Sequence, residues 1–248
     1  MRFPMKTILK SIGLYLTVFL SIILLGCGTT TTTGTRIDNI PMYGQPTIQR
    51  PDVLKRADED FIKQASDLTG GSREKASQAL FGEGNRFMNE RNLDFAMRRY
   101  NQSWLLNPNN YQPYWGFGQV MIELNKFDEA IQYLEKSLQL FQLIDGQSEK
   151  PGLIATFGMA YSAQAMCIPN DKLPEKKRLF LLADKYFDEG TTLDPTHEEI
   201  WRRWAFSMYA QEDYSGAWEK VKQARIHNAW PSSPIFLRAL EQKMPEPK

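Results

Sequence analysis

Few residues in this 248-residue sequence are spaced for catalysis or metal binding. The two cysteines, Cys27 and Cys167, and the two histidines, His197 and His227, lack a second cysteine or histidine at ligand spacing. Ser72 begins a Ser-x-x-Lys nucleophile pattern, but the companion motifs of that chemistry are missing and the position suits a helix N-cap. No glycine-rich phosphate loop or paired carboxylates stand out. We therefore predict a protein that is not an enzyme and that holds no cofactor or metal.

Cys27 stands at the end of an apolar run. Residues 1–10 carry basic side chains and no acid, and residues 11–26 are apolar or small throughout. This layout predicts an export signal over residues 1–26, because the run is shorter than the roughly 20 residues that a membrane span needs. An uncleaved signal anchor, extended past Lys10, is the alternative.

The tetrapeptide Leu24-Leu25-Gly26-Cys27 resembles the bacterial lipobox, although Leu25 departs from the more usual Ala or Ser. The resemblance implies that the signal is cut before Cys27, whose thiol receives a diacylglyceryl group. Two or three acyl chains, at ~0.8 kcal/mol per buried CH₂, would anchor the protein stably in a membrane. In lipoproteins of Gram-negative bacteria, an aspartate directly after the lipidated cysteine favours retention in the inner membrane. This sequence has Gly28 at that position, so the resemblance implies a location at the periplasmic face of the outer membrane. A cysteine placed there by chance is the alternative.

Residues 27–51 are predicted to be the lipidated cysteine and a flexible tether. This stretch holds five consecutive threonines, three glycines and three prolines, and its apolar residues are too scattered to bury. As a flexible coil it would span roughly 25–30 Å on average. Such a tether would hold a folded domain near a membrane.

The charges of the whole chain are nearly balanced, with 30 Lys and Arg against 29 Asp and Glu. This balance argues against a nucleic-acid partner, which would favour a strong basic excess. Hydrophobic residues make up 42% of the sequence, so a sizeable core is feasible.

The remaining sequence repeats itself, since residues 77–110 align with residues 111–144 at a shift of 34. Small residues meet small residues in this alignment, and bulky residues meet bulky ones. A period of this length indicates a repeat architecture. Examples are Gly84 with Gly118, Ala96 with Ala130, and Tyr100 with Leu134.

Two further units follow, at residues 151–197 and 198–231. The third unit carries an insertion near residues 164–176, which contains Cys167 and whose role the sequence leaves open. Each unit offers two apolar stripes with helical spacing, separated by a polar turn, and small residues that would let the paired helices approach closely. We predict an all-α fold of about four helical hairpins over residues 77–231.

Single helices are expected to flank these units. Residues 52–70 place Leu54, Phe61 and Leu68 on one apolar stripe with charges opposite. Residues 232–248 offer Ser233 as an N-cap, followed by proline and an apolar stripe. Both helices would cap the exposed ends of the core.

The four units together resemble the tetratricopeptide repeat (TPR) family. The residue pattern of that family, in order along one unit, is a bulky residue, Leu-Gly, Tyr, Ala, an aromatic residue, Ala and Pro. The third unit is interrupted, and the fourth has Ala205 in place of glycine and lacks the expected proline. The resemblance implies antiparallel helix pairs stacked into a right-handed superhelical solenoid. It implies little about function, because the fold is a scaffold for many partners.

In TPR proteins the first helix of each unit lines a groove that binds a partner. Aromatic residues mixed with amides would suit an extended or helical peptide there. Alternatively, the aromatic members of the set only pack against their neighbours. Transferred by position, the candidate groove residues are Phe81, Asn85, Trp115, Gln119, Met159, Arg202, Arg203 and Phe206.

The predicted function is that of a membrane-anchored adaptor or scaffold lipoprotein, binding protein or peptide partners in the bacterial cell envelope. One alternative is a structural oligomer in which repeat edges stack subunit on subunit. Another is an enzyme that acts on peptidoglycan through the 164–176 insertion, which the missing catalytic constellation disfavours. The sequence leaves the partner and the oligomeric state open.

Overall fold

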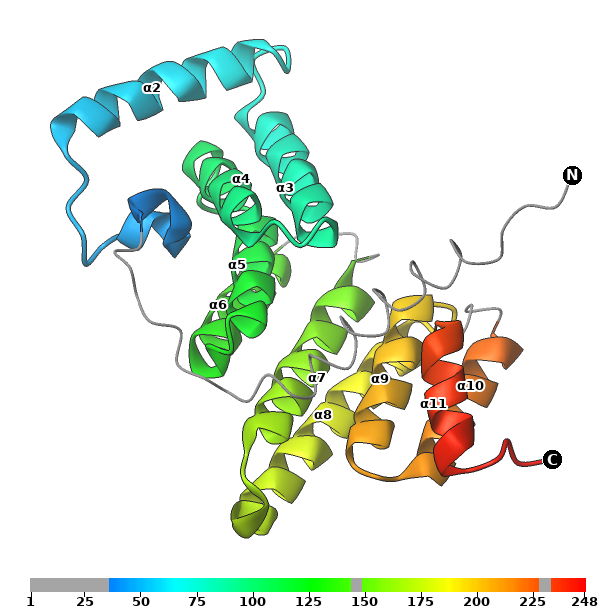
Figure 1. Ribbon diagram of the computed structural model, residues 1–248. Coiled ribbons are helices and arrows are strands. Elements are labelled where there is room, and N and C mark those ends of the chain that lie inside the picture. The colour runs from blue at the N-terminus through cyan, green and yellow to red at the C-terminus, as the bar shows by residue number, and fades with distance from the viewer. Residues whose placement is uncertain (1–35, 144–148, 228–232) are drawn as a thin grey trace, which may run out of the picture. The chain divides into compact units, whose positions relative to one another are not determined.

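The computed structural model describes residues 36–143, 149–227 and 233–248 (Figure 1). The predicted signal, Cys27 and the first part of the tether lie outside these ranges. The described residues are all-α and contain no β-strand, as the sequence analysis expected. Within these ranges, no helix combines the length and the apolar character required to cross a membrane.

Ten α-helices and three short 3₁₀ helices account for the regular structure of the described residues. The 3₁₀ helices are η1 (Ile37–Asn39), η2 (Pro41–Gly44) and η3 (Asn170–Lys172). The α-helices are α2 (Asp52–Asp67), α3 (Arg73–Asn89), α4 (Leu93–Leu106), α5 (Tyr111–Glu123), α6 (Phe127–Phe141), α7 (Lys150–Cys167), α8 (Leu173–Leu193), α9 (Glu198–Ala210), α10 (Tyr214–Ile226) and α11 (Pro234–Lys243).

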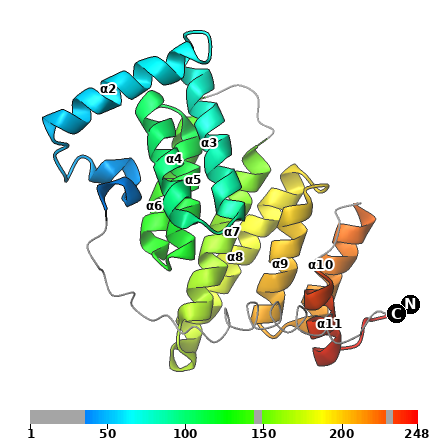
Figure 2. The ribbon, with the colours of Figure 1, turned by 45° about the horizontal axis from the view of Figure 1, so that its top comes forward.

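The helices pack in consecutive pairs (Figures 1 and 2). The most extensive contacts join α3 with α4, α5 with α6, α7 with α8, and α9 with α10. Each pair meets the next through the second helix of one and the first helix of the other. The first helices also contact one another in a row, from α3 to α5, α7 and α9. This row defines a shared face that we call the first-helix face.

Small residues lie where the paired helices touch, as the repeat alignment predicts. A Cβ atom at Gly84 would clash with the Tyr100 ring of the paired helix. A Cβ at Gly118 would lie 2.7 Å from Leu134, the residue that the alignment matches to Tyr100. The alanines on the second helices, Ala96, Ala130, Ala183 and Ala217, are all fully buried.

The turns inside three of the pairs share one geometry. Arg91, Asn125 and Glu212 each follow the first helix in the left-handed conformation, with φ between 58° and 62°. The next backbone N–H then returns to a carbonyl in the last turn of that helix, which is a Schellman-type ending. These bonds run from Asn92 to Phe87, from Lys126 to Met121, and from Asp213 to Met208.

The insertion of the third unit lengthens its helices. Helix α7 runs on to Cys167 and α8 begins at Leu173, with η3 between them. Leu179 and Phe180 of α8 are buried against Ala165 of α7. The inserted residues therefore extend the pair, and Ala165 among them is buried against residues of α8.

The two flanking helices behave differently. Helix α11 packs against the fourth pair, where Phe236 and Leu240 are buried in one cluster with Trp218. Helix α2 contacts α3 and α4, and Leu68, expected on its buried stripe, is 87% exposed. Its apolar stripe therefore covers little of the core.

The predicted flexible tether up to residue 51 differs from the structure. Residues 36–50 pack against α4 through η1 and η2, and Pro41, Tyr43 and Arg50 are buried. Met42, one of the apolar residues that seemed scattered in the sequence, packs against the main core cluster. The described part of this stretch belongs to the folded domain.

Candidate functional site

The candidate groove residues occupy successive levels of the first-helix face. Phe81 of α3, Trp115 of α5 and Thr156 of α7 form one level: the Phe81 and Trp115 rings are 6.1 Å apart, and Trp115 donates a hydrogen bond to Thr156. Residues three or four positions further along a helix lie on the same side. The next level therefore consists of Asn85, Gln119 and Met159.

Phe81 is a core residue. Its side chain is 6% exposed and packs against the rings of Tyr100, at 5.7 Å, and Trp115. The interpretation of Phe81 as a partner contact is therefore corrected, because the neighbouring unit covers the ring. The sequence alternative, simple packing against neighbours, holds at this position.

Trp115 joins two helix pairs. Its Nε1 donates to Thr156 Oγ1 at 2.9 Å, and Thr156 in turn donates to the carbonyl oxygen of Gly152 at 2.8 Å. A Cβ at Gly152 would approach the Trp115 ring to 3.2 Å, so glycine leaves room for the indole. Sequence reasoning missed Thr156, although a polar residue inside the apolar α7 stretch was a usable signal.

Polar and sulfur-containing side chains form the second level. Asn85 accepts a hydrogen bond from the Tyr100 hydroxyl at 2.8 Å and is half-buried. Gln119 and Met159 are half-buried too. An amide offers both donors and acceptors, and a thioether adapts its shape to apolar groups. This level can contact a peptide through its backbone and its apolar side chains.

Helix α9 brings two arginines to the same face. Arg203 donates to Glu199 at 3.2 Å and to the Met159 sulfur at 2.9 Å, which links α9 to α7. Arg202 pairs with the same glutamate. The Arg203 side chain is 31% exposed and that of Arg202 48% exposed, so both guanidinium groups keep donors within reach of a partner.

The charges around Glu199 stabilise one another. Burial alone would raise the pKa of Glu199, but the hydrogen bond from Arg202 and the two guanidinium charges hold its pKa below the ordinary value. Burial lowers the pKa of Arg203, and the negative charge of Glu199 only partly offsets this shift. The carboxylate therefore stays ionised, and the pair of arginines forms a cationic group at the α9 end of the face.

Phe206 lies under the C-terminal helix. It is half-buried, and its ring is 6.1 Å from that of Phe236 on α11. Because α11 packs where a fifth helix pair would continue the stack, Phe206 contributes to capping. The face that remains for a partner consists of Asn85, Gln119, Met159, Arg202 and Arg203.

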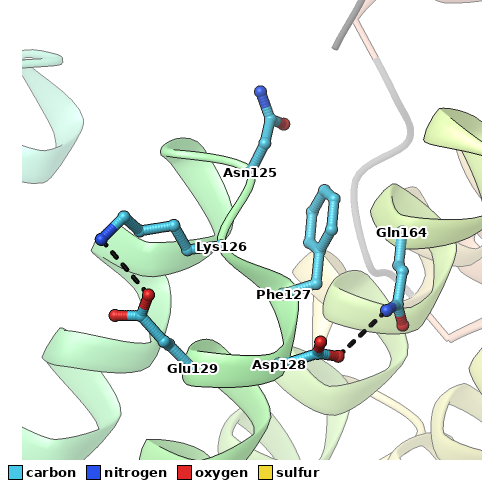
Figure 3. A pocket seen from close by; sticks show the side chains of 6 residues that line it. All are labelled: Asn125, Lys126, Phe127, Asp128, Glu129 and Gln164. Carbon is cyan, nitrogen blue, oxygen red and sulfur yellow. Dashed lines mark hydrogen bonds and ion pairs between the residues drawn. The ribbon is translucent and has the colours of Figure 1, made fainter. Parts of the chain in front are cut away.

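A small hollow outside this face went unnoticed in the sequence (Figure 3). It has a volume of about 210 Å³ and lies between the α5–α6 turn and α7. Four of its polar side chains pair with each other: Lys126 with Glu129 at 3.3 Å, and Gln164 with Asp128 at 3.2 Å. The hollow is lined by Asn125, Lys126, Phe127, Asp128, Glu129 and Gln164.

Ser72 and the two histidines, which the sequence analysis considered for catalysis or metal binding, lie at helix starts or pack against a ring. Ser72 caps α3, with its Oγ accepting from the Lys75 backbone N–H at 3.2 Å. His227 stacks on Trp201, and His197 lies at the start of α9. Among the described residues, no group of three or more His, Cys, Asp or Glu side chains could hold a metal ion.

Fold and site together define an all-helical protein of stacked helix pairs with one face built by first helices. Comparison of the chain with protein-family models and with curated proteins finds no match. The resemblance to the TPR family therefore rests on the residue pattern alone.

Proposed function

We propose that this protein is a TPR-type adaptor lipoprotein of the bacterial cell envelope, which binds a protein or peptide partner through the first-helix face. The row of contacts from α3 through α5 and α7 to α9 carries this proposal. It brings side chains from all four units onto one surface, which suits an extended or helical ligand. The TPR arrangement is further supported by the helix contacts at Gly84 and Gly118 and by the shared turn geometry.

The chemistry of the face favours a peptide with acidic and apolar groups. Arg202 and Arg203 offer guanidinium donors, which bind carboxylates in a bidentate manner. Gln119 and Asn85 suit backbone amides, and Met159 suits an apolar side chain.

Affinity capture from native envelopes tests the partner-binding face. Arg203→Ala combined with Gln119→Ala should reduce recovery of the partner at least tenfold, since hot-spot contacts of this kind contribute ~2 kcal/mol or more. Glu135→Ala combined with Lys222→Ala, at exposed positions of second helices, is the matched control and should leave recovery unchanged. Equal recovery with both double variants would exclude the first-helix face.

The membrane anchor rests on the lipobox, since Cys27 lies outside the described residues. Cys27→Ala should abolish fatty-acid labelling and leave either a soluble protein or an unprocessed precursor. Palmitate incorporation at the wild-type level in this variant would refute the anchor. Fractionation of the labelled wild-type protein tests the outer-membrane location.

A further inference from the structure

The segment that precedes α2 is fastened to the outer side of α4. In Figure 2 the 3₁₀ turns η1 and η2 lie beside α4, and the chain then continues into α2. Asn101 of α4 is fully buried and donates hydrogen bonds to the backbone oxygens of Asp38, at 2.9 Å, and Ile40, at 2.8 Å. Arg98 donates to the Asn39 side chain at 3.3 Å. We call residues 36–50 the strap.

The receiving position on α4 differs from its counterparts in the other helix pairs. Five residues after the buried alanine of each second helix, the other pairs carry Glu135, Asp188 and Lys222, all of them exposed and charged. Only the first pair has a neutral amide there, and a segment of chain covers it. An asparagine with two donors matches two backbone carbonyls, whereas a charged side chain would be costly to bury. The outer side of α4 is thus specialised to hold the strap.

A second attachment connects the strap to α2. Arg50 is buried, its guanidinium lies 3.8 Å from the centre of the Tyr43 ring, and it forms a bidentate pair with Asp58 of α2. The shorter arm of this pair joins Nε to the carboxylate, and Nη2 lies 2.6 Å from the other oxygen. Burial of Tyr43 and Arg50 therefore depends on both the strap and α2 being in place.

The strap is attached at two separate places, and part of its backbone is strained. Residues 46–49, between the two attachments, are exposed. Met42 and Tyr43 both have left-handed backbones, with φ of 52° and 54°, which side chains with a Cβ disfavour. The strap is held by these polar bonds and by the packing of Pro41, Met42 and Tyr43. A short segment with so few attachments opens at a lower free energy than the helical core.

We propose that the strap is releasable and sets the length of chain between the membrane anchor and the helical domain. With the strap docked, the chain from residue 27 to residue 36 reaches at most about 30 Å; with the strap released, the chain from residue 27 to residue 52 reaches at most about 85 Å. Release therefore lets the first-helix face reach partners further from the membrane. This consequence rests on the proposed lipid at Cys27, whereas the docking equilibrium does not.

Hydrogen exchange of the full mature protein, purified in detergent, tests the docking equilibrium. The strap contains hydrogen-bonded amides at Asn39, Ile40 and Tyr43. These amides should be protected, yet should exchange faster than the amides of α5 and α6. Asn101→Leu removes both bonds to the strap carbonyls and should accelerate their exchange at least tenfold. Glu135→Leu, the counterpart in the next pair, should leave it unchanged.

Three outcomes would overturn the proposal. The strap amides could exchange as fast as an unstructured peptide in the wild type, which would mean that no docked state exists. They could exchange together with α5 and α6, which would mean that the strap never opens alone. They could also keep their wild-type rate in both Asn101→Leu and Arg98→Ala. The second variant loses the bond to Asn39 and a contact with the Phe95 ring within α4, and it decides the matter if the first fails to fold. If the wild-type protein incorporates no palmitate, the proposed lipid anchor is refuted, but the measured docking equilibrium of the strap still holds.

Discussion

Asp184 on α8 shows how single polar residues shape the stability of this protein. Its carboxylate accepts hydrogen bonds from Trp204 Nε1 at 3.0 Å and from Gln211 Nε2 at 3.2 Å. Burial raises the pKa of Asp184, and these two donors together with Lys220 only partly offset the effect. Because the folded state binds the proton more tightly, this contribution to stability is present below the ordinary aspartate pKa and is lost as the pH rises through the raised pKa.

Asp184→Asn should therefore raise the melting temperature at pH 7, since an amide oxygen still accepts from Trp204 and carries no charge. As the pH is lowered to about 4 the advantage should shrink, because the raised pKa lets the wild-type carboxyl take up its proton more readily than a free aspartate does. Thermal unfolding at both pH values measures this difference. Asp188→Asn, an exposed position one helical turn further on, is the control and should show no such pH dependence. A variant less stable than the wild type at pH 7 would show that the charged form is the one stabilised.

The individual roles of the candidate site residues could be predicted from the sequence only in part. Helical spacing predicts Trp115 and Arg203 beside the packing stripes of first helices, and both side chains are half-buried in the structure. It cannot say which side chains the neighbouring pair covers, because that depends on how the pairs are rotated against each other. Phe81 is buried for this reason, and Phe206 lies against Phe236 because a capping helix follows the fourth pair.

At the scale of elements, helix α3 offers two glycines with opposite surroundings. Gly84 faces the buried Tyr100 ring, whereas Gly82 has open space around its Cβ position. Gly84→Ala should push the paired helices apart at a cost of ~1–3 kcal/mol, which lowers the melting temperature by several degrees. Gly82→Ala should instead add ~0.5–1 kcal/mol of stability, because alanine favours the helix.

Calorimetry or circular dichroism of the two variants decides between these expectations. The comparison is well matched, since both substitutions add the same methyl group to the same helix two residues apart. Equal shifts of the melting temperature in the two variants would contradict the close helix contact at Gly84.

The sequence predicts the helix pairs well because each pair buries its own small and bulky residues at a fixed period. It does not predict the strap, whose contacts are made far along the chain and follow no period: Asn101 bonds to carbonyls of residues 38 and 40. The sequence also overstates how much of α2 is buried. An amphipathic stripe does not ensure that another element covers it, as the exposed Leu68 shows.

For the whole molecule, we propose that the first-helix face binds a partner while the N-terminus holds the protein to a membrane. The second helices and α11 have packing roles, and in the hollow near Gln164 four of the polar side chains already pair with one another. A partner should therefore contact the first helices and leave the outer sides of the second helices free.

Site-specific photo-crosslinking in native cells tests this claim most directly. A photo-crosslinking residue is placed at position 119 on the first-helix face, or at position 135 on the outer side of α6 as the control. The account predicts a discrete protein or peptide adduct from position 119 and none from position 135. An adduct from position 135, with none from position 119, would contradict it.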